Sequence, residues 1–471
     1  MAKLNHITIE DNYGFGTFYG KKLDADKKLI ESINQNYNFP NTSFSKDNIH
    51  LISLKQSNAT KSIEELLGNE ILSLSIKIED DEHIVNAKTG NFIGVIYDAE
   101  NNLKIEITSR FGNRFLQHML NYINNIFIPD ISFSSKKDNK KEHSQYQFIL
   151  AQLFIQSLEK GASIFGLPKI YITQDLHAYK IRGKLNIPDL ISYNIPIRKK
   201  LHSTFREQKE VQEIIDVLYC ALSILDKKFR GIINARILGI KNLLKEKHQT
   251  KLVSSATIQK ALHHKALLHP SYQAFKPILK YAEMIIKNYD MTEDDKGKLK
   301  SKAYLFDVSE LFEIYIEKLL KKGLEGWTVS AQEKIKTYEE TFFEREIRPD
   351  LVLKKDNQVL VFDTKYKRMN YNGKDNYGAG DVDRNDFFQI HTYMAHYFDA
   401  SQQTQRLAGG LLYPIEGEYK KVQSDNWLGN EGKFVIDGIA LNGINDVANF
   451  NEEIPKRETA FIERITELIN N

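Results

Sequence analysis

The stretch REIRPDLVLKKDNQVLVFDTKYK, residues 345–367, decides the fold of the last third of the chain. Two apolar-rich runs flank Asp356 and Asn357, which predicts a β-hairpin closed by a two-residue turn. With the turn centred there, Asp350 lies directly opposite Asp363, with Cβ atoms about 5 Å apart on one sheet face. Facing carboxylates destabilise an apolar sheet unless a cation lies between them or one is protonated.

A lysine completes this pattern. Lys365 follows Asp363 by two residues and projects from the same face, because side chains alternate along a strand. Two acids and an ammonium group on a packed sheet predict a Mg²⁺ site, with Mn²⁺ as the alternative ion. Such a site suits phosphodiester hydrolysis, since the metal lowers the pKa of a bound water. Taken alone, the pattern also fits a salt-bridged surface hairpin.

Two predicted helices bring further polar side chains towards the hairpin. Gln389 and Tyr393 are four residues apart in a helix over 386–397, so they share a face within reach of a metal or a phosphate. Upstream, Glu313 lies in the helical pattern SELFEIYIEKLL. By helical periodicity alone, it belongs to a polar stripe with Glu310 and Glu317.

Length and composition indicate several folded domains. With 471 residues, of which 41% are hydrophobic, the chain is long enough for about three domains of about 150 residues. Changes in periodicity predict an α+β multidomain fold. The expected parts are a β-rich N-terminal domain (1–130), a charged linker (131–145), a mainly helical, basic middle domain (146–301) and an α/β domain with a mixed central sheet (302–471).

The charge is unevenly distributed along the chain. The overall formal charge is only +3, but residues 196–265 contain 15 Lys and Arg against 6 Asp and Glu. That segment carries +9 and the remainder −6. The basic cluster fits either a solvated helix face or a surface that meets phosphate or an acidic partner. The lone Cys220 excludes an intramolecular disulfide, and the absence of a signal sequence or long apolar run predicts a cytoplasmic protein without a membrane partner.

The motifs together resemble a known nuclease group. Pro349-Asp350 and Asp363-Thr364-Lys365 match the PD-(D/E)XK signature of restriction-endonuclease-like nucleases, and Gln389 with Tyr393 matches the QxxxY pair of the RecB-like branch. More narrowly, the chain resembles the McrC family, the nuclease subunits of McrBC-type modification-dependent restriction systems. The matching segments are EITSRF (106–111), IRGKLNI (181–187), LFE (311–313), RPDLVL (348–353), VFDTKYK (361–367), DFFQIHTYM (386–394) and GGLLYP (409–414).

The resemblance implies a Mg²⁺-dependent DNA endonuclease subunit of a phage-defence system. It implies cleavage of double-stranded DNA with modified cytosine, in assembly with a McrB-like AAA+ GTPase hexamer whose GTP hydrolysis the N-terminal domain stimulates. Asp350, Asp363 and Glu313 are then the expected metal ligands. Lys365 assists the attacking water or the transition-state charge, and Gln389 and Tyr393 position substrate or lysine.

Two alternative functions remain at this point. A stand-alone RecB-like repair exonuclease would cleave from DNA ends without a partner or nucleotide. A non-catalytic adaptor would stimulate a GTPase without cleaving DNA. Cleavage and GTPase assays discriminate these functions.

Overall fold

A computed structural model describes most of the chain. It describes residues 5–11, 36–42, 44, 48–52, 71–79, 82–124, 145–189, 191, 200–229, 235–250, 252–289, 301–337, 340, 342, 345–367, 369, 382–397, 406–427, 430–444 and 446–470. The chain forms two compact units. One consists of Met1–Tyr146 together with Asp295–Asn471, and the other is Gln147–Asp294. The predicted linker falls almost entirely outside the described residues.

The N-terminal part of the first unit is β-rich, as predicted. Its five-stranded sheet has the order β1 (Asn5–Glu10), β7 (Leu103–Thr108), β6 (Phe92–Asp98), β11 (Lys302–Asp307) and β3 (Ile49–Ile52). A second sheet contains β2 (Asn36–Phe39), β4 (Leu72–Glu79) and β5 (Glu82–Thr89), and helix α3 spans Gly112–Asn124.

Strand β11 corrects one expected boundary. Residues 302–307 were expected to open the C-terminal domain, but β11 pairs antiparallel with β6 and parallel with β3 in the N-terminal sheet. The reason is burial: Ala303 and Leu305 join the hydrophobic core that also contains Ile7 and Ile105. The N-terminal sheet therefore contains four strands that precede the middle unit in the sequence and one strand, β11, that follows it.

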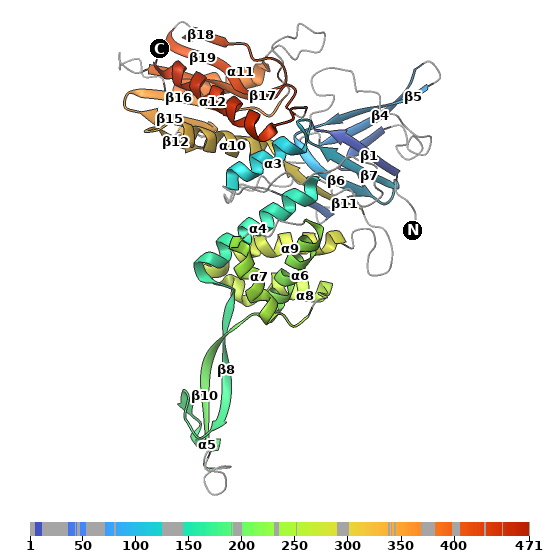
Figure 1. The fold of residues 1–471 in the computed structure, drawn as a ribbon, viewed down its shortest axis with the longest axis vertical. Helices are drawn as coiled ribbons and strands as arrows, with labels where there is room; N and C mark the ends of the chain where they lie inside the picture. The colour runs from blue at the N-terminus through green and yellow to red at the C-terminus, as the bar shows by residue number, and fades with distance from the viewer. Residues whose placement is uncertain are drawn as a thin grey trace. The chain divides into compact units, whose positions relative to one another are not determined.

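The C-terminal part contains the predicted mixed sheet. Its strand order is β12 (Thr328–Ala331), β15 (Leu351–Lys355), β16 (Gln358–Thr364), β17 (Arg406–Ile415), β19 (Asn430–Ala440) and β18 (Val422–Trp427). The central neighbours β16, β17 and β19 are parallel, and the outer pairs are antiparallel. Helices α10 (Val308–Gly323), α11 (Arg384–Tyr397) and α12 (Phe450–Asn470) belong to the same part of the chain (Figure 1). A separate two-stranded sheet contains β13 (Ile335–Thr337) and β14 (Arg345–Ile347).

Local sequence explains the central hairpin. Asp356 adopts φ +49°, a left-handed conformation that Asp tolerates better than most residues, and this closes the turn between β15 and β16. On the neighbouring β17, Gly410 lies so close to β19 that an added Cβ would stand 1.8 Å from the Val435 carbonyl oxygen. Glycine thus permits the parallel strands to pack at this point.

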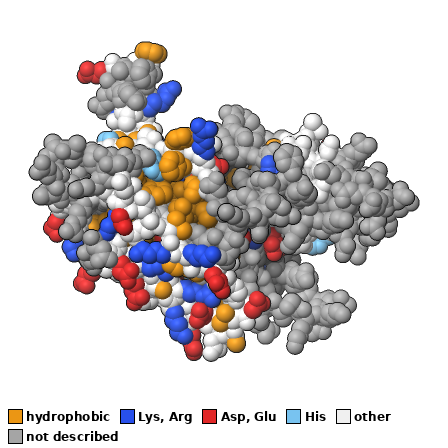
Figure 2. All heavy atoms as spheres, turned by 90° about the horizontal axis from the view of Figure 1, so that it is seen from above, with side chains coloured by type: hydrophobic (Ala, Val, Ile, Leu, Met, Phe, Trp, Pro, Cys, Tyr) orange, Lys and Arg blue, Asp and Glu red, His pale blue; other side chains and the backbone are white. Residues whose placement is uncertain are grey.

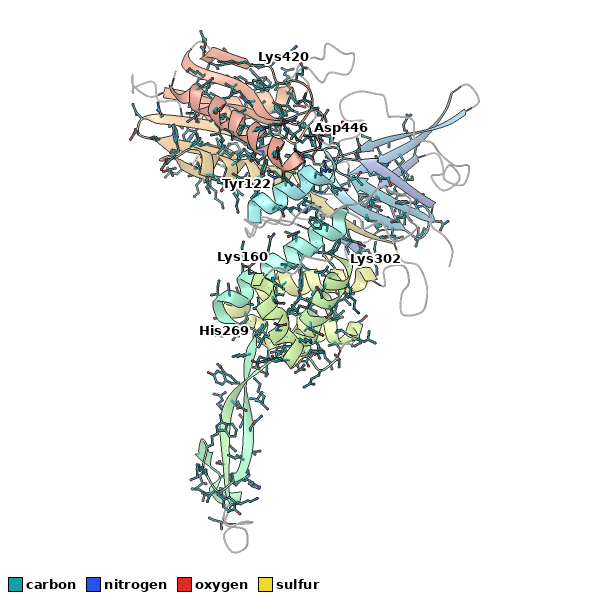
Figure 3. All side chains as sticks on the ribbon, in the orientation of Figure 1. Tyr122, Lys160, His269, Lys302, Lys420 and Asp446 are labelled. Carbon is teal, nitrogen blue, oxygen red and sulfur yellow. The ribbon has the colours of Figure 1, made fainter. Side chains whose placement is uncertain are left out.

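The second unit combines helices with an antiparallel sheet. The sheet order is β8 (Lys169–Ala178), β10 (Leu201–Glu210) and β9 (Lys184–Leu185). Side chains project from both faces of the long β8–β10 ribbon (Figure 3). The helices are α4 (Gln145–Phe165), α5 (Ile187–Asp189), α6 (Gln212–Lys228), α7 (Ala235–Lys247), α8 (Ser255–Leu262) and α9 (Phe275–Tyr289), with 3₁₀ turns at Lys265–Leu268 and Pro270–Tyr272.

Part of the basic charge of this unit is neutralised internally. Lys247 pairs with Glu210, and Lys241 Nζ lies 2.6 Å from an Asp226 carboxylate oxygen. These pairs favour the solvated-face interpretation for part of the cluster. Among the helices that the structure describes, none has the length and apolar character needed to cross a bilayer.

Candidate active site

The observed hairpin register places the two aspartates together. Leu351 pairs with Phe362 and Lys355 with Gln358, so continuing the register by one residue sets Asp350 opposite Asp363. The turn and the register predicted from the sequence are therefore confirmed. The hairpin is buried rather than superficial, because Leu351 and Phe362 are fully shielded from solvent.

Asp363 lies in an unfavourable environment for a carboxylate. Its exposure is only 1%. Burial, followed by the negative charge of Asp350, raises the pKa of Asp363 to about 8, although Lys365 acts in the opposite direction. Lys365 Nζ lies 2.6 Å from Asp363 Oδ2. The site thus holds more negative charge than this lysine alone compensates.

Lys365 keeps its proton despite being largely enclosed. Burial by itself would lower the pKa of its ammonium group, but Asp363 and the nearby Asp386 and Asp350 raise it above the ordinary value. Its Nζ also donates to Gln389 Oε1 at 2.7 Å. The lysine is therefore a fixed positive charge at the carboxylate pair.

The predicted helical pair meets the lysine. Gln389 Nε2 donates to the Tyr393 hydroxyl at 2.7 Å, while its Oε1 accepts from Lys365. Burial raises the pKa of Tyr393, which keeps its hydroxyl protonated. Both side chains come from α11, which packs on the sheet through Ile390 and Met394. The pair orients Lys365.

Asp350 is held by three donors. Its Oδ2 accepts from the backbone N–H and from the hydroxyl of Thr364, each at 2.9 Å. Its Oδ1 accepts from Gln332 Nε2 at 2.8 Å. These bonds fix the carboxylate at the end of the hairpin.

Glu313 reaches the same place from α10. Only 9% of it is exposed, whereas Glu310 and Glu317 of the same stripe are half-buried. Gln332 Nε2 donates to Glu313 Oε1 at 2.7 Å and so joins Glu313 to Asp350. The structure thus brings Glu313 beside the hairpin acids.

Three polar residues at the site were not singled out from the sequence. Gln332 follows β12 with φ +53°, and its position depends on a break between strands that no spacing predicts. Thr364 was noted only as the middle residue of a motif. Asp386 did carry a signal, because it shares the stripe of Gln389 and Tyr393 at i, i+3 and i+7.

Asp386 extends the charged network. It is 5% exposed, with Oδ1 3.4 Å from Lys365 Nζ and Oδ2 2.7 Å from Lys367 Nζ. The assembled cluster therefore contains four carboxylates and two ammonium groups, which are Glu313, Asp350, Asp363, Asp386, Lys365 and Lys367.

The donor chemistry of this cluster fits a hard divalent cation. Carboxylate oxygens are the ligands that Mg²⁺ prefers, and a cation would offset the burial and the negative charge of Asp350 that together raise the pKa of Asp363. Within the described residues, no three His, Cys, Asp or Glu side chains stand in metal-binding geometry. Glu313 and Asp350 are instead bridged by the Gln332 amide, and Asp363 is paired with Lys365.

Comparison with known proteins identifies the family. A family model described as "McrBC 5-methylcytosine restriction system component" matches residues 87–414, well over half of the chain. The chain belongs to this family. The resemblance to McrBC-type proteins that the sequence motifs indicated is confirmed, and the McrBC match includes every residue of the cluster described above.

Solved structures of McrBC assemblies are also similar to this chain. A refined half-complex from the tetradecameric assembly of Thermococcus gammatolerans McrB AAA+ hexamers with bound McrC contains a chain with 14% identity and a TM-score of 0.48, covering 98% of this chain and 100% of that one. A cryo-EM structure of the Thermococcus gammatolerans McrBC complex gives 15% identity and a TM-score of 0.31, covering 68% and 88%. No curated protein matches the chain.

Proposed function

We propose that the chain is the Mg²⁺-dependent DNA endonuclease subunit of a McrBC-type restriction system, with a PD-(D/E)XK nuclease fold in its C-terminal part. One observation carries the proposal: Asp350, Asp363 and Lys365 converge at the end of a buried hairpin. A buried carboxylate, Asp363, that faces a half-buried one, Asp350, lowers the stability of the fold, and a catalytic cation bound between them would offset that cost.

Asp350 and Asp363 would hold the metal, with Glu313 as a third acid. When bound, Mg²⁺ supplies Lewis-acid activation of the scissile phosphodiester and of a water molecule. Lys365 holds its proton and offers positive charge where the pentavalent phosphate accumulates negative charge. Gln389 and Tyr393 keep that ammonium group in place, and Asp386 supports it from α11.

Family membership supports the proposed partners, which are a McrB-like AAA+ GTPase hexamer and double-stranded DNA containing modified cytosine. One face of the described residues agrees with a division of labour between subunits. Figure 2 shows acidic and basic side chains interspersed on the described part of the face seen from above, beside a group of hydrophobic side chains. A face of mixed sign does not attract DNA strongly by itself. We infer that the partner subunits make many of the contacts that hold the DNA. We also propose that the assembly acts in the cytoplasm.

The first test removes the lysine or its partner acid. Lys365→Met and Asp363→Asn should each lower the rate of cleavage of methylcytosine DNA by at least about 100-fold, because the first removes positive charge at the phosphate and the second removes a ligand of the metal. Cleavage is measured with the partner GTPase, GTP and Mg²⁺. The matched control is Lys355→Met, at an exposed position in the same hairpin, which should cleave at the wild-type rate.

The alternative functions give different results in the same experiment. Unchanged cleavage by Lys365→Met would refute the assignment of the site. Cleavage from DNA ends by the wild-type chain alone, without nucleotide, would indicate a RecB-like exonuclease. Full stimulation of the partner's GTPase without any cleavage by the wild-type protein would indicate a non-catalytic adaptor.

A further inference from the structure

A buried arginine joins the N-terminal sheet to the strands of the candidate site. Arg110 follows β7, and its side chain is 2% exposed. Its Nη1 lies 3.2 Å from Asp11 Oδ2, and its backbone N–H donates to Asp11 Oδ1 at 2.7 Å. On the other side, its Nε lies 2.9 Å from Glu416 Oε1, just beyond β17. A buried guanidinium group needs such partners, and here they come from both sheets.

The guanidinium group also lies over two aromatic rings, which meet each other edge to face. Its carbon is 4.6 Å from the ring centroid of Phe111 and 4.5 Å from that of Tyr366. The planar guanidinium group contacts both rings while its nitrogens pair with two acids, and the single ammonium group of a lysine cannot make all of these contacts at once. We call Asp11, Arg110, Phe111, Tyr366 and Glu416 the Arg110 cluster.

Tyr366 connects the Arg110 cluster to the candidate site at two points. It follows Lys365 directly in the chain and is 2% exposed. Its ring also packs against Phe312 at a centroid distance of 5.8 Å, and Phe312 directly precedes Glu313. The buried Tyr366 ring therefore packs beside both the segment that carries Lys365 and helix α10, which carries Glu313.

We propose that Arg110 is a positioning residue: through its cation–π contact with Tyr366, it holds Lys365 and Glu313 in register with the hairpin carboxylates. The inference rests on the proposed function and adds that the N-terminal sheet controls the geometry of the nuclease site. Displacement of a reacting group by about 1 Å costs about 100-fold in rate, so a small shift of Tyr366 is enough to impair cleavage.

The conservative variant Arg110→Lys separates positioning from stability. Lysine keeps the positive charge near Asp11 and Glu416 but loses the broad guanidinium contact with the Tyr366 ring. We expect a melting temperature within a few degrees of the wild type, an unchanged KM for DNA and a kcat lowered at least about 10-fold. If Arg110 only stabilises the fold, the lysine should restore both stability and kcat.

Hydrogen exchange tests the same inference without cleavage. The backbone amide of Thr364 donates to the Asp350 carboxylate, and that of Lys365 donates to the Leu412 carbonyl. In Arg110→Lys, the peptide over 363–367 should exchange several-fold faster, while a peptide from β19 stays unchanged. This readout holds even if the wild-type chain does not cleave DNA, so failure of the proposed function and failure of the positioning role are distinguishable.

A matched control and a second variant complete the test. Arg114 of α3 also reaches the C-terminal part, where its Nη1 donates to the Val447 carbonyl at 3.0 Å, and it is not a member of the Arg110 cluster. Arg114→Met should leave kcat and exchange over 363–367 within about 2-fold of wild type.

If Arg110→Lys fails to fold, Tyr366→Leu removes the aromatic ring that Arg110 contacts and keeps the ion pairs. The same fall in kcat and the same faster exchange are expected. Wild-type exchange and kcat in the folded variant would overturn the proposal.

Discussion

At the candidate site, Asp363 lies in an environment that lowers the stability of the folded protein. Asp363 is enclosed, faces Asp350 and has a pKa raised to about 8 from 3.8. Functional sites commonly hold such perturbed groups, because catalysis needs charge where folding does not favour it. The hairpin retains this carboxylate although its apolar neighbours Val361 and Val352 would pack without it.

The perturbed carboxyl group predicts a pH dependence of stability. Between pH 4 and pH 8, folded Asp363 keeps a proton that the unfolded chain has released, so the wild type loses stability as pH rises through this window. Asparagine does not titrate. In the absence of divalent cations, the melting temperature of Asp363→Asn relative to wild type should therefore increase from pH 5 to pH 8.

Thermal scans at several pH values, without divalent cations, measure this difference. The control is Asp425→Asn, at an exposed carboxylate, whose melting temperature relative to wild type should not vary between pH 5 and pH 8. A constant offset for Asp363→Asn across the window would show that Asp363 is ionised in the folded protein.

At the scale of elements, the hairpin and helix α10 fold for different reasons. The hairpin is specified locally, by its turn and by alternating apolar residues. Helix α10 begins where β11 ends, and Asp307 belongs to both: it ends the strand and caps the helix, its Oδ1 accepting from the Ser309 N–H at 2.9 Å. The N-terminal sheet therefore sets the start of the helix that carries Glu313.

Removing this cap should weaken the junction. Asp307→Ala leaves the first amide groups of α10 without their carboxylate and should lower the free energy of unfolding by about 1 kcal/mol. Chemical denaturation measures the change. Glu325→Ala, at an exposed position beyond the other end of the helix, should change stability by less than about 0.5 kcal/mol. Equal effects of the two substitutions would argue against the capping role.

At the scale of the whole molecule, the first unit cannot be divided at residue 302. Strand β11 lies between β6 and β3, and the Arg110 cluster joins the ends of β1 and β7 to those of β16 and β17. The Arg110 cluster thus joins the two sheets, although the middle unit separates most of their strands in the sequence. The C-terminal part thus depends on residues more than 200 positions away in the sequence, since Arg110 contacts Tyr366.

Co-expression of two pieces tests this dependence. Met1–Tyr146 and Asp295–Asn471 should copurify as a complex, because β11 completes the N-terminal sheet and buries Leu305 within it. Leu305→Asp, which places a charge in that core, should abolish copurification. A C-terminal piece that is soluble, folded and monomeric by itself, without affinity for the first, would contradict the expectation.

The sequence by itself determined the local parts of this protein. The turn at Asp356, the pairing of Asp350 with Asp363, the projection of Lys365 and the shared face of Gln389 and Tyr393 all follow from short-range periodicity, and the structure agrees with each. The family could be predicted for the same reason, because its motifs are short and continuous.

The tertiary structure alone decided which distant segments meet. Nothing in the local pattern of residues 302–307 shows that they pair with β6 and β3, nor that Gln332 bridges Glu313 and Asp350, nor that Arg110 stacks on Tyr366. These contacts depend on burial of apolar surface and on pairing of buried charges between segments far apart in the chain. Such energies belong to the assembled fold, so no window of sequence contains them.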